Sequence, residues 1–110
     1  SYMFGVPISA HFVAQAQGLP TLTMVSNNSQ WLAVRGATLA VYPDGHAAKA
    51  NKPPVSDLNP SPAFEKTVEA SGGVGERVED PEALIPALER GLQTVADGRP
   101  ALLNVITQDR

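Results

Sequence analysis

The chain has 110 residues and a mass of 11.6 kDa, which suits one domain with a single modest core. Hydrophobic residues make up 43% and charged residues 17% of the chain, a balance that excludes a disordered composition. The net charge of −3 gives no reason to expect nucleic acid or an anionic membrane as a partner, and the lack of cysteine excludes disulfides, thiolate nucleophiles and cysteine-ligated metals.

The N-terminal segment predicts a helix from Pro7 to Gln17, because Pro7 suits an early helical position and Gly18 and Pro20 end the pattern. Its apolar face is expected to consist of three residues at helical spacing, Ile8, Phe12 and Ala16. The segment lacks the basic start of a signal peptide, and no apolar run approaches the roughly 20 residues that cross a bilayer. We therefore expect a cytoplasmic protein.

A short, β-branched and apolar run from Thr21 to Ser26 predicts a buried strand. A second helix is expected to begin at Asn28 or Ser29 and to continue to about Gly36.

The stretch from Val41 to Pro62 has no hydrophobic periodicity and contains AKANKPPVSDLNPSP. A long segment without a pattern is unusual in a compact domain and is often a functional cover or a mobile segment. We expect a proline-rich loop at about 41–60, poorly ordered or held only by neighbouring chains.

The periodic pattern returns after this loop. Ser61 is a good N-cap with Pro62 at the first helical position, and Phe64 and Val68 share one face of the predicted helix. Ser71-Gly72-Gly73 ends that helix, and VGERV (74–78) is consistent with a short strand.

A further helix is predicted from Pro81 to Ala96, with Asp80 as its N-cap and Gly98 closing it. Its buried stripe is expected to consist of Leu84, Leu88, Leu92 and Val95. Pro86 falls inside the pattern, so the helix either kinks or properly starts there. The last predicted strand is Ala101 to Thr107.

Helices that alternate with short apolar strands predict an α/β fold of three layers with a mainly parallel sheet. Thr21 to Ser26 and Ala101 to Thr107 should belong to this sheet. The pattern shows only about three strands, few for a sheet covered on both faces. We therefore expect an incomplete fold, the later part of a larger α/β domain.

Asn27 and Asn28 lie between the first predicted strand and the second predicted helix. Ligands of open α/β sheets gather beyond the carboxyl ends of strands, where helix N-termini also point. A carboxamide oxygen is a neutral, hard ligand that suits Mg²⁺, whose shell often includes phosphate oxygens. One interpretation is therefore a metal bridged to a phosphate. In the alternative, Asn28 caps the helix and Asn27 bonds a neighbouring loop.

Several other polar residues are better explained by structure than by chemistry. His11 is expected to be a surface or semi-buried helix residue, and His46, in the turn sequence YPDGH, a solvated loop residue, rather than an acid–base catalyst. Four carboxylates come close together in sequence, namely Glu76, Glu79, Asp80 and Glu82. The last two suit a helix start better than a catalytic site.

For two more features of the sequence, the support for a functional role is weak or undecided. Gly72-Gly73-Val74-Gly75 resembles a phosphate loop only superficially, because it lacks the Lys-Ser/Thr ending. Trp31 fits a substrate pocket and a core position about equally well.

An ordered set of segments runs through nearly the whole chain: Ser1-Tyr2-Met3-Phe4-Gly5, QGLP (17–20), TLTMVS (21–26), Asn27-Asn28 followed by Trp31, DLNPSPAF (57–64), GGVGERVEDPEAL (72–84) and RPALLNVIT (99–107). This set resembles the thiamine diphosphate-dependent enzymes, above all the acetolactate synthase and benzoylformate decarboxylase group. The cofactor motif of that family begins with Gly-Asp-Gly and ends with Asn-Asn, and Ser1 to Ser26 matches the spacer. The resemblance implies the C-terminal cofactor-binding domain, truncated just after Gly-Asp-Gly.

The resemblance also implies the cofactors, thiamine diphosphate and Mg²⁺, and roles for individual residues. Asn28 would bind Mg²⁺ through its side-chain oxygen and Gln30 through its backbone carbonyl. Ser1 would contact the diphosphate, and Phe4 and Trp31 would lie near the cofactor. No catalytic residue is assigned, because the family's acidic Mg²⁺ ligand and the domain whose glutamate activates the cofactor are both missing from these residues.

The function implied by the resemblance is chemistry on a 2-keto acid, which loses carbon dioxide while the cofactor acts as electron sink. Acetolactate synthase-like carboligation and 2-keto acid decarboxylation both stay open. The missing remainder of the enzyme chain and a homodimer or homotetramer are the implied partners, and the fragment alone is expected to be inactive. A non-catalytic α/β binding or assembly module is the alternative.

Overall fold

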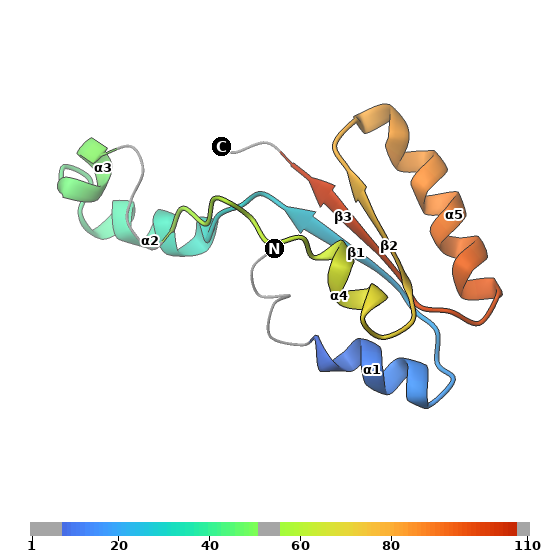
Figure 1. Ribbon diagram of the computed structural model, residues 1–110. Helices are drawn as coiled ribbons and strands as arrows, with labels where there is room; N and C mark the ends of the chain where they lie inside the picture. Colours follow the sequence, from blue (N-terminus) through green and yellow to red (C-terminus); the bar gives the residue numbers. More distant parts are fainter. Residues whose placement is uncertain (1–7, 51–55, 108–110) are drawn as a thin grey trace.

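A three-stranded parallel sheet lies at the centre of the computed structural model, which describes residues 8–50 and 56–107 (Figure 1). The strands are β1 (Leu22–Asn27), β2 (Val74–Val78) and β3 (Ala101–Ile106). The sheet order is β1-β3-β2, and Ala101 of β3 is level with Leu22 on one side and Val74 on the other. The predicted parallel sheet is confirmed, with each strand within one residue of its expected bounds.

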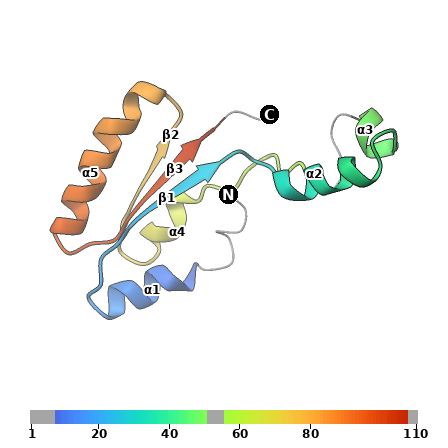
Figure 2. The same cartoon turned by 180° about the vertical axis from the view of Figure 1, so that it is seen from behind.

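Helices cover both faces of the sheet, as the front and back views show (Figures 1 and 2). α4 (Glu65–Glu69), with α1 (Ser9–Ala16) beside it, lies on one face, and α5 (Leu84–Ala96) lies on the other. The buried cluster on the α4 face consists of Val25, Phe64, Val68 and Leu102. The cluster on the α5 face consists of Val78, Ala87 and Leu103. The three-layer α/β architecture is therefore confirmed.

β1 is buried on one face only, which corrects the expected fully buried strand. Val25 and Asn27 are buried on the α4 side, whereas Met24 is 56% exposed on the other side. The reason is that β1 is an edge strand, and α5 reaches it only where Leu22 packs against the helix.

α1 is shorter than predicted, and its expected apolar face is wrong. Phe12 is 67% exposed, and Ile8 and Ala16 are exposed as well, while His11 is the buried residue at 4%. The side of the helix that meets α4 is thus the side that carries His11. Pro7, the predicted first residue, lies outside the described residues.

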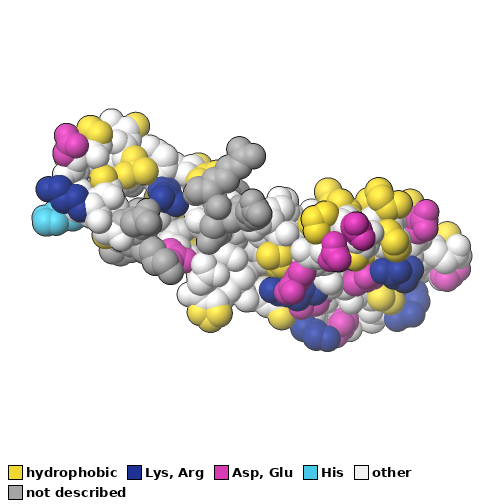
Figure 3. Space-filling model, turned by 90° about the horizontal axis from the view of Figure 1, so that it is seen from above, with side chains coloured by type: hydrophobic (Ala, Val, Ile, Leu, Met, Phe, Trp, Pro, Cys, Tyr) yellow, Lys and Arg dark blue, Asp and Glu magenta, His cyan; other side chains and the backbone are white. Residues whose placement is uncertain are grey.

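The second helix, α2 (Leu32–Val41), begins and ends later than predicted. A short helix, α3 (His46–Ala50), follows inside the stretch that was expected to have no regular structure. Neither helix buries a residue, and together they form an arm, residues 32–50, that projects from the sheet (Figures 1 and 3). Residues 51–55 of the proline-rich loop lie outside the described residues.

α4 begins at Glu65 and not at Pro62, because Ser61 does not cap it: the Ser61 hydroxyl accepts a hydrogen bond from Asn27 instead. Asp80 is confirmed as a cap, since its carboxylate accepts the Glu82 N–H at 2.9 Å. It caps a 3₁₀ turn, η2 (Pro81–Ala83), that leads into α5.

The predicted buried stripe of α5 is wrong at Leu92 and misses two buried residues, while Leu84, Leu88 and Val95 are partly buried. Leu92 is 59% exposed, while Ala87 and Gly91 are buried. Pro86 neither starts the helix nor interrupts it, because it lies in the first turn, where its missing N–H breaks no helical bond. Gly98, with φ +82°, ends the helix as predicted. None of the described helices is long and apolar enough to cross a membrane.

Candidate functional site

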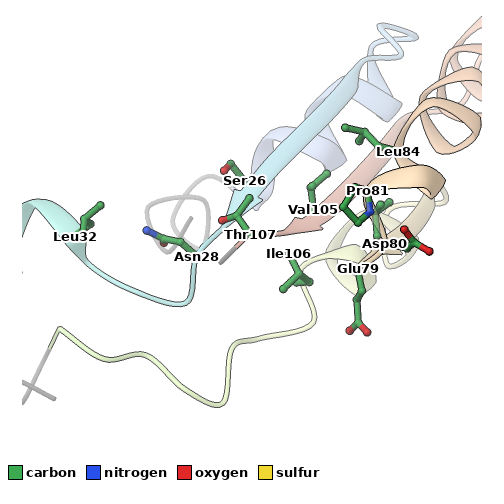
Figure 4. A pocket seen from close by; sticks show the side chains of 11 residues that line it. Ser26, Asn28, Leu32, Glu79, Asp80, Pro81, Leu84, Val105, Ile106 and Thr107 are labelled. Carbon is green, nitrogen blue, oxygen red and sulfur yellow. The ribbon is translucent and has the colours of Figure 1, made fainter. Parts of the chain in front are cut away.

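A cleft of about 760 Å³ opens where the three parallel strands end. It is lined by residues from the end of each strand and from the starts of α2 and α5, namely Ser26, Asn28, Leu32, Val78, Glu79, Asp80, Pro81, Leu84, Val105, Ile106 and Thr107 (Figure 4). This is the edge of an open α/β sheet at which ligands bind. The cleft is therefore the candidate site.

Asn27 does not reach the cleft, because its side chain is fully buried under the sheet edge. Its Nδ2 donates to Ser61 Oγ at 2.8 Å and to Asn104 Oδ1 at 3.0 Å. Its Oδ1 accepts the Ser29 N–H at 3.1 Å. The structural interpretation of Asn27, a bond to a neighbouring loop, is confirmed.

Asn28 lines the cleft (Figure 4). Its Oδ1 accepts the Gln30 N–H at 3.2 Å, so Asn27 and Asn28 make two overlapping turns in which a side chain bonds the backbone two residues on. Ser29, the donor of the first turn and the middle residue of the second, has φ +51°. Asn28 is therefore not the cap of α2, which starts only at Leu32 with no side-chain cap. The expected helix N-terminus directly after Asn28 is wrong for the same reason.

Gln30 and Trp31 lie on a short antiparallel bridge with the segment around Asp57. The bridge is made by Trp31 N–H to Ser56 O and Leu58 N–H to Ser29 O, both 2.9 Å. Gln30 is opposite Asp57, and its own carbonyl oxygen takes no part in this pairing. Trp31 is 38% exposed, so it is not a core residue. Ser1 and Phe4, the other two residues of the predicted site, lie outside the described residues.

The carboxylates near the cleft are engaged in structural contacts. Glu79 pairs with Arg77 at 2.6 Å, Glu76 pairs with Arg90, and Asp80 is the cap described above. In the described part of the chain, no group of three or more His, Asp and Glu side chains is arranged to hold a metal. The prediction that Asp80 serves the start of a helix is confirmed.

Neither described histidine lines the cleft. His11 is buried on α1, and this burial lowers the pKa of its imidazole below the ordinary value of 6.5. His46 is exposed at the start of α3, on the arm. His11 is thus more deeply buried than the expected surface or semi-buried residue, and His46 is solvent-exposed as expected but belongs to a helix and not to a loop.

The glycine-rich sequence at 72–75 serves packing. A Cβ on Gly73 would lie 2.4 Å from a Val68 methyl carbon, and a Cβ on Gly75 would lie 1.9 Å from the Glu65 carbonyl oxygen. None of these glycines lines the cleft, so the resemblance to a phosphate loop has no structural counterpart.

Of the predicted site residues that the structure describes, Asn28 lines the cleft, and Gln30 and Trp31 do not. The oxygens of Asn28 and Gln30 are of the kind that suits one side of a magnesium–phosphate group. The Asn28 carboxamide is a hard, neutral donor, the Gln30 carbonyl is free of the bridge, and the space is large enough for a diphosphate. Among the described residues, however, the acidic side chains that line the cleft are the engaged Glu79 and Asp80, on the β2 and η2 side. The described residues thus fit a part of a magnesium site.

Comparison with known proteins identifies the family of the chain. The family described as "Thiamine pyrophosphate enzyme, C-terminal TPP binding domain" matches residues 4–105. "Probable acetolactate synthase" of Mycobacterium bovis and "Acetolactate synthase large subunit IlvG" of Mycobacterium tuberculosis are each 35% identical over 86 residues, which is 78% of this chain. The chain matches only 14% of the length of either relative. No solved structure matches it significantly.

Proposed function

This chain belongs to the thiamine pyrophosphate enzymes, as part of their C-terminal TPP binding domain, and on that premise we propose that it forms the magnesium side of a cofactor site in an enzyme that acts on 2-keto acids. The reaction class is acetolactate synthase-like carboligation or 2-keto acid decarboxylation. The enzyme names of the two mycobacterial relatives support the first of these.

The observation that carries the proposal is the position of Asn28. It lies at the carboxyl end of the parallel sheet, on a cleft of about 760 Å³, at the place where the family motif ends in Asn-Asn. The side chain of the neighbouring Asn27 is buried and donates hydrogen bonds to Ser61 and Asn104. Asn28 is therefore the member of the pair that we expect to face a ligand.

In this proposal, Asn28 holds Mg²⁺ through Oδ1 and Gln30 holds it through its backbone carbonyl. The turn in which the Gln30 N–H is bonded to Asn28 Oδ1 supports this proposal, because it fixes the two residues relative to each other. Ser1 would contact the diphosphate, and Phe4 and Trp31 would lie near the cofactor. When bound, thiamine diphosphate supplies an electron sink for the decarboxylation of the substrate.

The proposal extends to the protein as a whole. The matched relatives are much longer than this chain, so the remainder of the enzyme supplies the acidic metal ligand and the groups that activate the cofactor. We propose that the 110-residue portion is inactive alone, and that the intact enzyme is a cytoplasmic homodimer or homotetramer.

The test is a titration of thiamine diphosphate at several Mg²⁺ concentrations with the intact protein. Asn28→Ala should weaken binding at limiting Mg²⁺ by about tenfold or more and recover partly when metal and cofactor are raised. Asn28→Asp keeps both a turn acceptor and an oxygen ligand, so it should bind nearly as well as the parent. An Asn28→Ala protein that binds cofactor like the parent would remove the metal assignment.

Gln30→Ala is the matched control for the backbone ligand. It deletes the side chain, with its long 3.4 Å contact to Arg35, but keeps the carbonyl oxygen. Cofactor affinity should therefore change little. Asn27→Ala is unsuitable as a control, because it removes three hydrogen bonds from a buried side chain.

The substrate class is tested separately, by supplying pyruvate and benzoylformate to the intact enzyme and following release of carbon dioxide and the carbon–carbon bond in the product. A condensed product from pyruvate indicates carboligation, and a free aldehyde indicates decarboxylation. If Mg²⁺ and thiamine diphosphate bind but neither acid is consumed, the chain belongs to a binding or assembly module and the proposed reaction is wrong.

A further inference from the structure

A chain of buried hydrogen bonds runs beneath the cleft, from α4 through β3 to the turn after β1. Asn104 Nδ2 donates to Glu65 Oε2 at 2.6 Å, and Asn27 Nδ2 donates to Asn104 Oδ1 at 3.0 Å. The Ser29 N–H donates to Asn27 Oδ1 at 3.1 Å. Glu65 is 9% exposed, and Asn27 and Asn104 are fully buried.

The direction of this chain is set by the carboxylate at its end. An ionised glutamate can only accept hydrogen bonds, so Asn104 must turn its NH₂ group toward Glu65. Its oxygen then faces Asn27, which must present its own NH₂ group there. Asn27 is left with its oxygen toward the turn, where it accepts the Ser29 N–H. Hydrogen bonds that all run in one direction and end at a charged group polarise one another, and in a buried site this strengthens each of them.

Glu65 is held in place by packing on both sides. Its neighbours Phe64 and Val68 are buried in the cluster on the α4 face of the sheet. On the other side, the missing Cβ of Gly75 lets the Glu65 backbone approach β2, since an added Cβ would lie 1.9 Å from the Glu65 oxygen. The carboxylate is therefore fixed by the fold independently of any ligand in the cleft.

We propose that Glu65 is a positioning residue, which acts through Asn104 and Asn27 to hold the turn that presents Asn28 to the cleft. Without the carboxylate, the Asn104 carboxamide can rotate and offer its NH₂ group to Asn27, which reverses the chain and removes the acceptor for Ser29. Glu65 itself does not line the cleft. Its effect on metal binding rests on the proposed role of Asn28.

The experiment measures amide hydrogen exchange of the intact protein in peptides that span Asn27 to Trp31. Glu65→Leu should speed exchange at Ser29 by about tenfold, as expected for the loss of one hydrogen bond. Glu65→Gln still offers an oxygen to Asn104, so it should restore slow exchange. Val68→Ala is the matched control: it lies on the same helix, is fully buried and weakens the core, but leaves the chain intact.

Exchange at Ser29 that is the same in Glu65→Leu and the parent would overturn the proposal. So would equal acceleration in Val68→Ala at equal loss of thermal stability, because the effect would then be general softening of the fold.

Titration of Mg²⁺ and thiamine diphosphate on the same variants separates this inference from the proposed function. Faster exchange with weaker metal-dependent binding supports both. Faster exchange with unchanged binding supports the positioning of the turn and contradicts the role of Asn28 as a ligand.

Discussion

Asn27 is fully buried at the end of β1, whereas Asn28, one residue later, lines the cleft. The difference follows from strand geometry. Along β1, Val25 and Asn27 point to the α4 face of the sheet, because side chains alternate from one face to the other. Asn28 is the first residue after the strand, and its side chain lines the cleft instead. Substitutions at Asn27 therefore probe the fold, and substitutions at Asn28 probe the cleft.

His11 predicts a pH dependence of stability. Burial lowers the pKa of its imidazole in the folded chain below 6.5, so the unfolded chain binds the proton more readily. The stability of the neutral, buried form is fully present above pH 6.5 and is lost as the pH falls from 6.5 through the folded pKa. Chemical denaturation of the intact protein between pH 5 and 8 should show stability decreasing on the acid side.

The matched variant for this prediction is His11→Leu, which removes the titrating group and keeps an apolar side chain of similar reach. The free energy of unfolding of this variant should no longer show the pH dependence that comes from His11. An acid-side slope that stays unchanged in His11→Leu would assign it to other groups.

Two glycines decide how closely the helices approach the sheet. A Cβ on Gly75 would lie 1.9 Å from a backbone oxygen of α4, which has nowhere to move. A Cβ on Gly91 would lie 2.8 Å from a methyl carbon of Leu22, the flexible end of a side chain. The first contact is therefore rigid, and the second can relax.

Gly75→Ala should accordingly lower the free energy of unfolding by about 3 kcal/mol, because the α4 backbone must shift. Gly91→Ala should stay within about 1 kcal/mol of the parent, since the gain in helix propensity offsets the displaced Leu22. Chemical denaturation of both variants measures the difference. Equal losses in the two variants would show that the Glu65 backbone is freer to move than its packing indicates.

At the level of elements, strands follow the sequence more closely than helices do. Apolar, β-branched runs place the strands to within a residue, because the pattern and the pairing agree. The predicted start of a helix is wrong where the expected capping side chain forms a hydrogen bond elsewhere. Ser61 bonds Asn27 instead of capping α4, and the Asn27–Gln30 turns delay α2 to Leu32. Asn27 is 34 positions from Ser61, so no local pattern signals the first competition. The second is local, because the turn residues directly precede α2, and the same asparagines suit either a turn or a helix cap.

The molecule as a whole is extended, 53 × 30 × 20 Å, because the arm of α2 and α3 stands away from the sheet (Figure 1). Large apolar side chains are exposed on or beside this arm: Trp31, Leu32, Val34, Val41 and Tyr42. Exposed apolar surface of this kind usually meets a partner. It fits the proposal that the intact enzyme is at least a dimer.

The intact protein should therefore sediment as a dimer or larger species. Tyr42→Asp, which places a charge on a side chain that is 66% exposed on the arm, should shift the equilibrium toward smaller species. Lys49→Glu, on α3 of the same arm, is the control for a change of charge alone and should leave the assembly intact. A clean monomer of the unaltered protein in analytical ultracentrifugation would contradict the prediction.

By itself the sequence determined the alternation of strands and helices, the parallel three-layer architecture and the segments that relate the chain to its family. These depend on local periodicity and on residue types that neighbours along the chain can satisfy. The tertiary structure alone decided which asparagine is buried, which face of α1 packs and how Glu65 reaches Asn27 through Asn104. The hydrogen bonds of that network join residues up to 77 positions apart. The pairing of β1 with β3 brings Asn27 and Asn104 together, and the packing of α4 against the sheet adds Glu65, because a buried polar group takes its partner from whatever the fold places beside it.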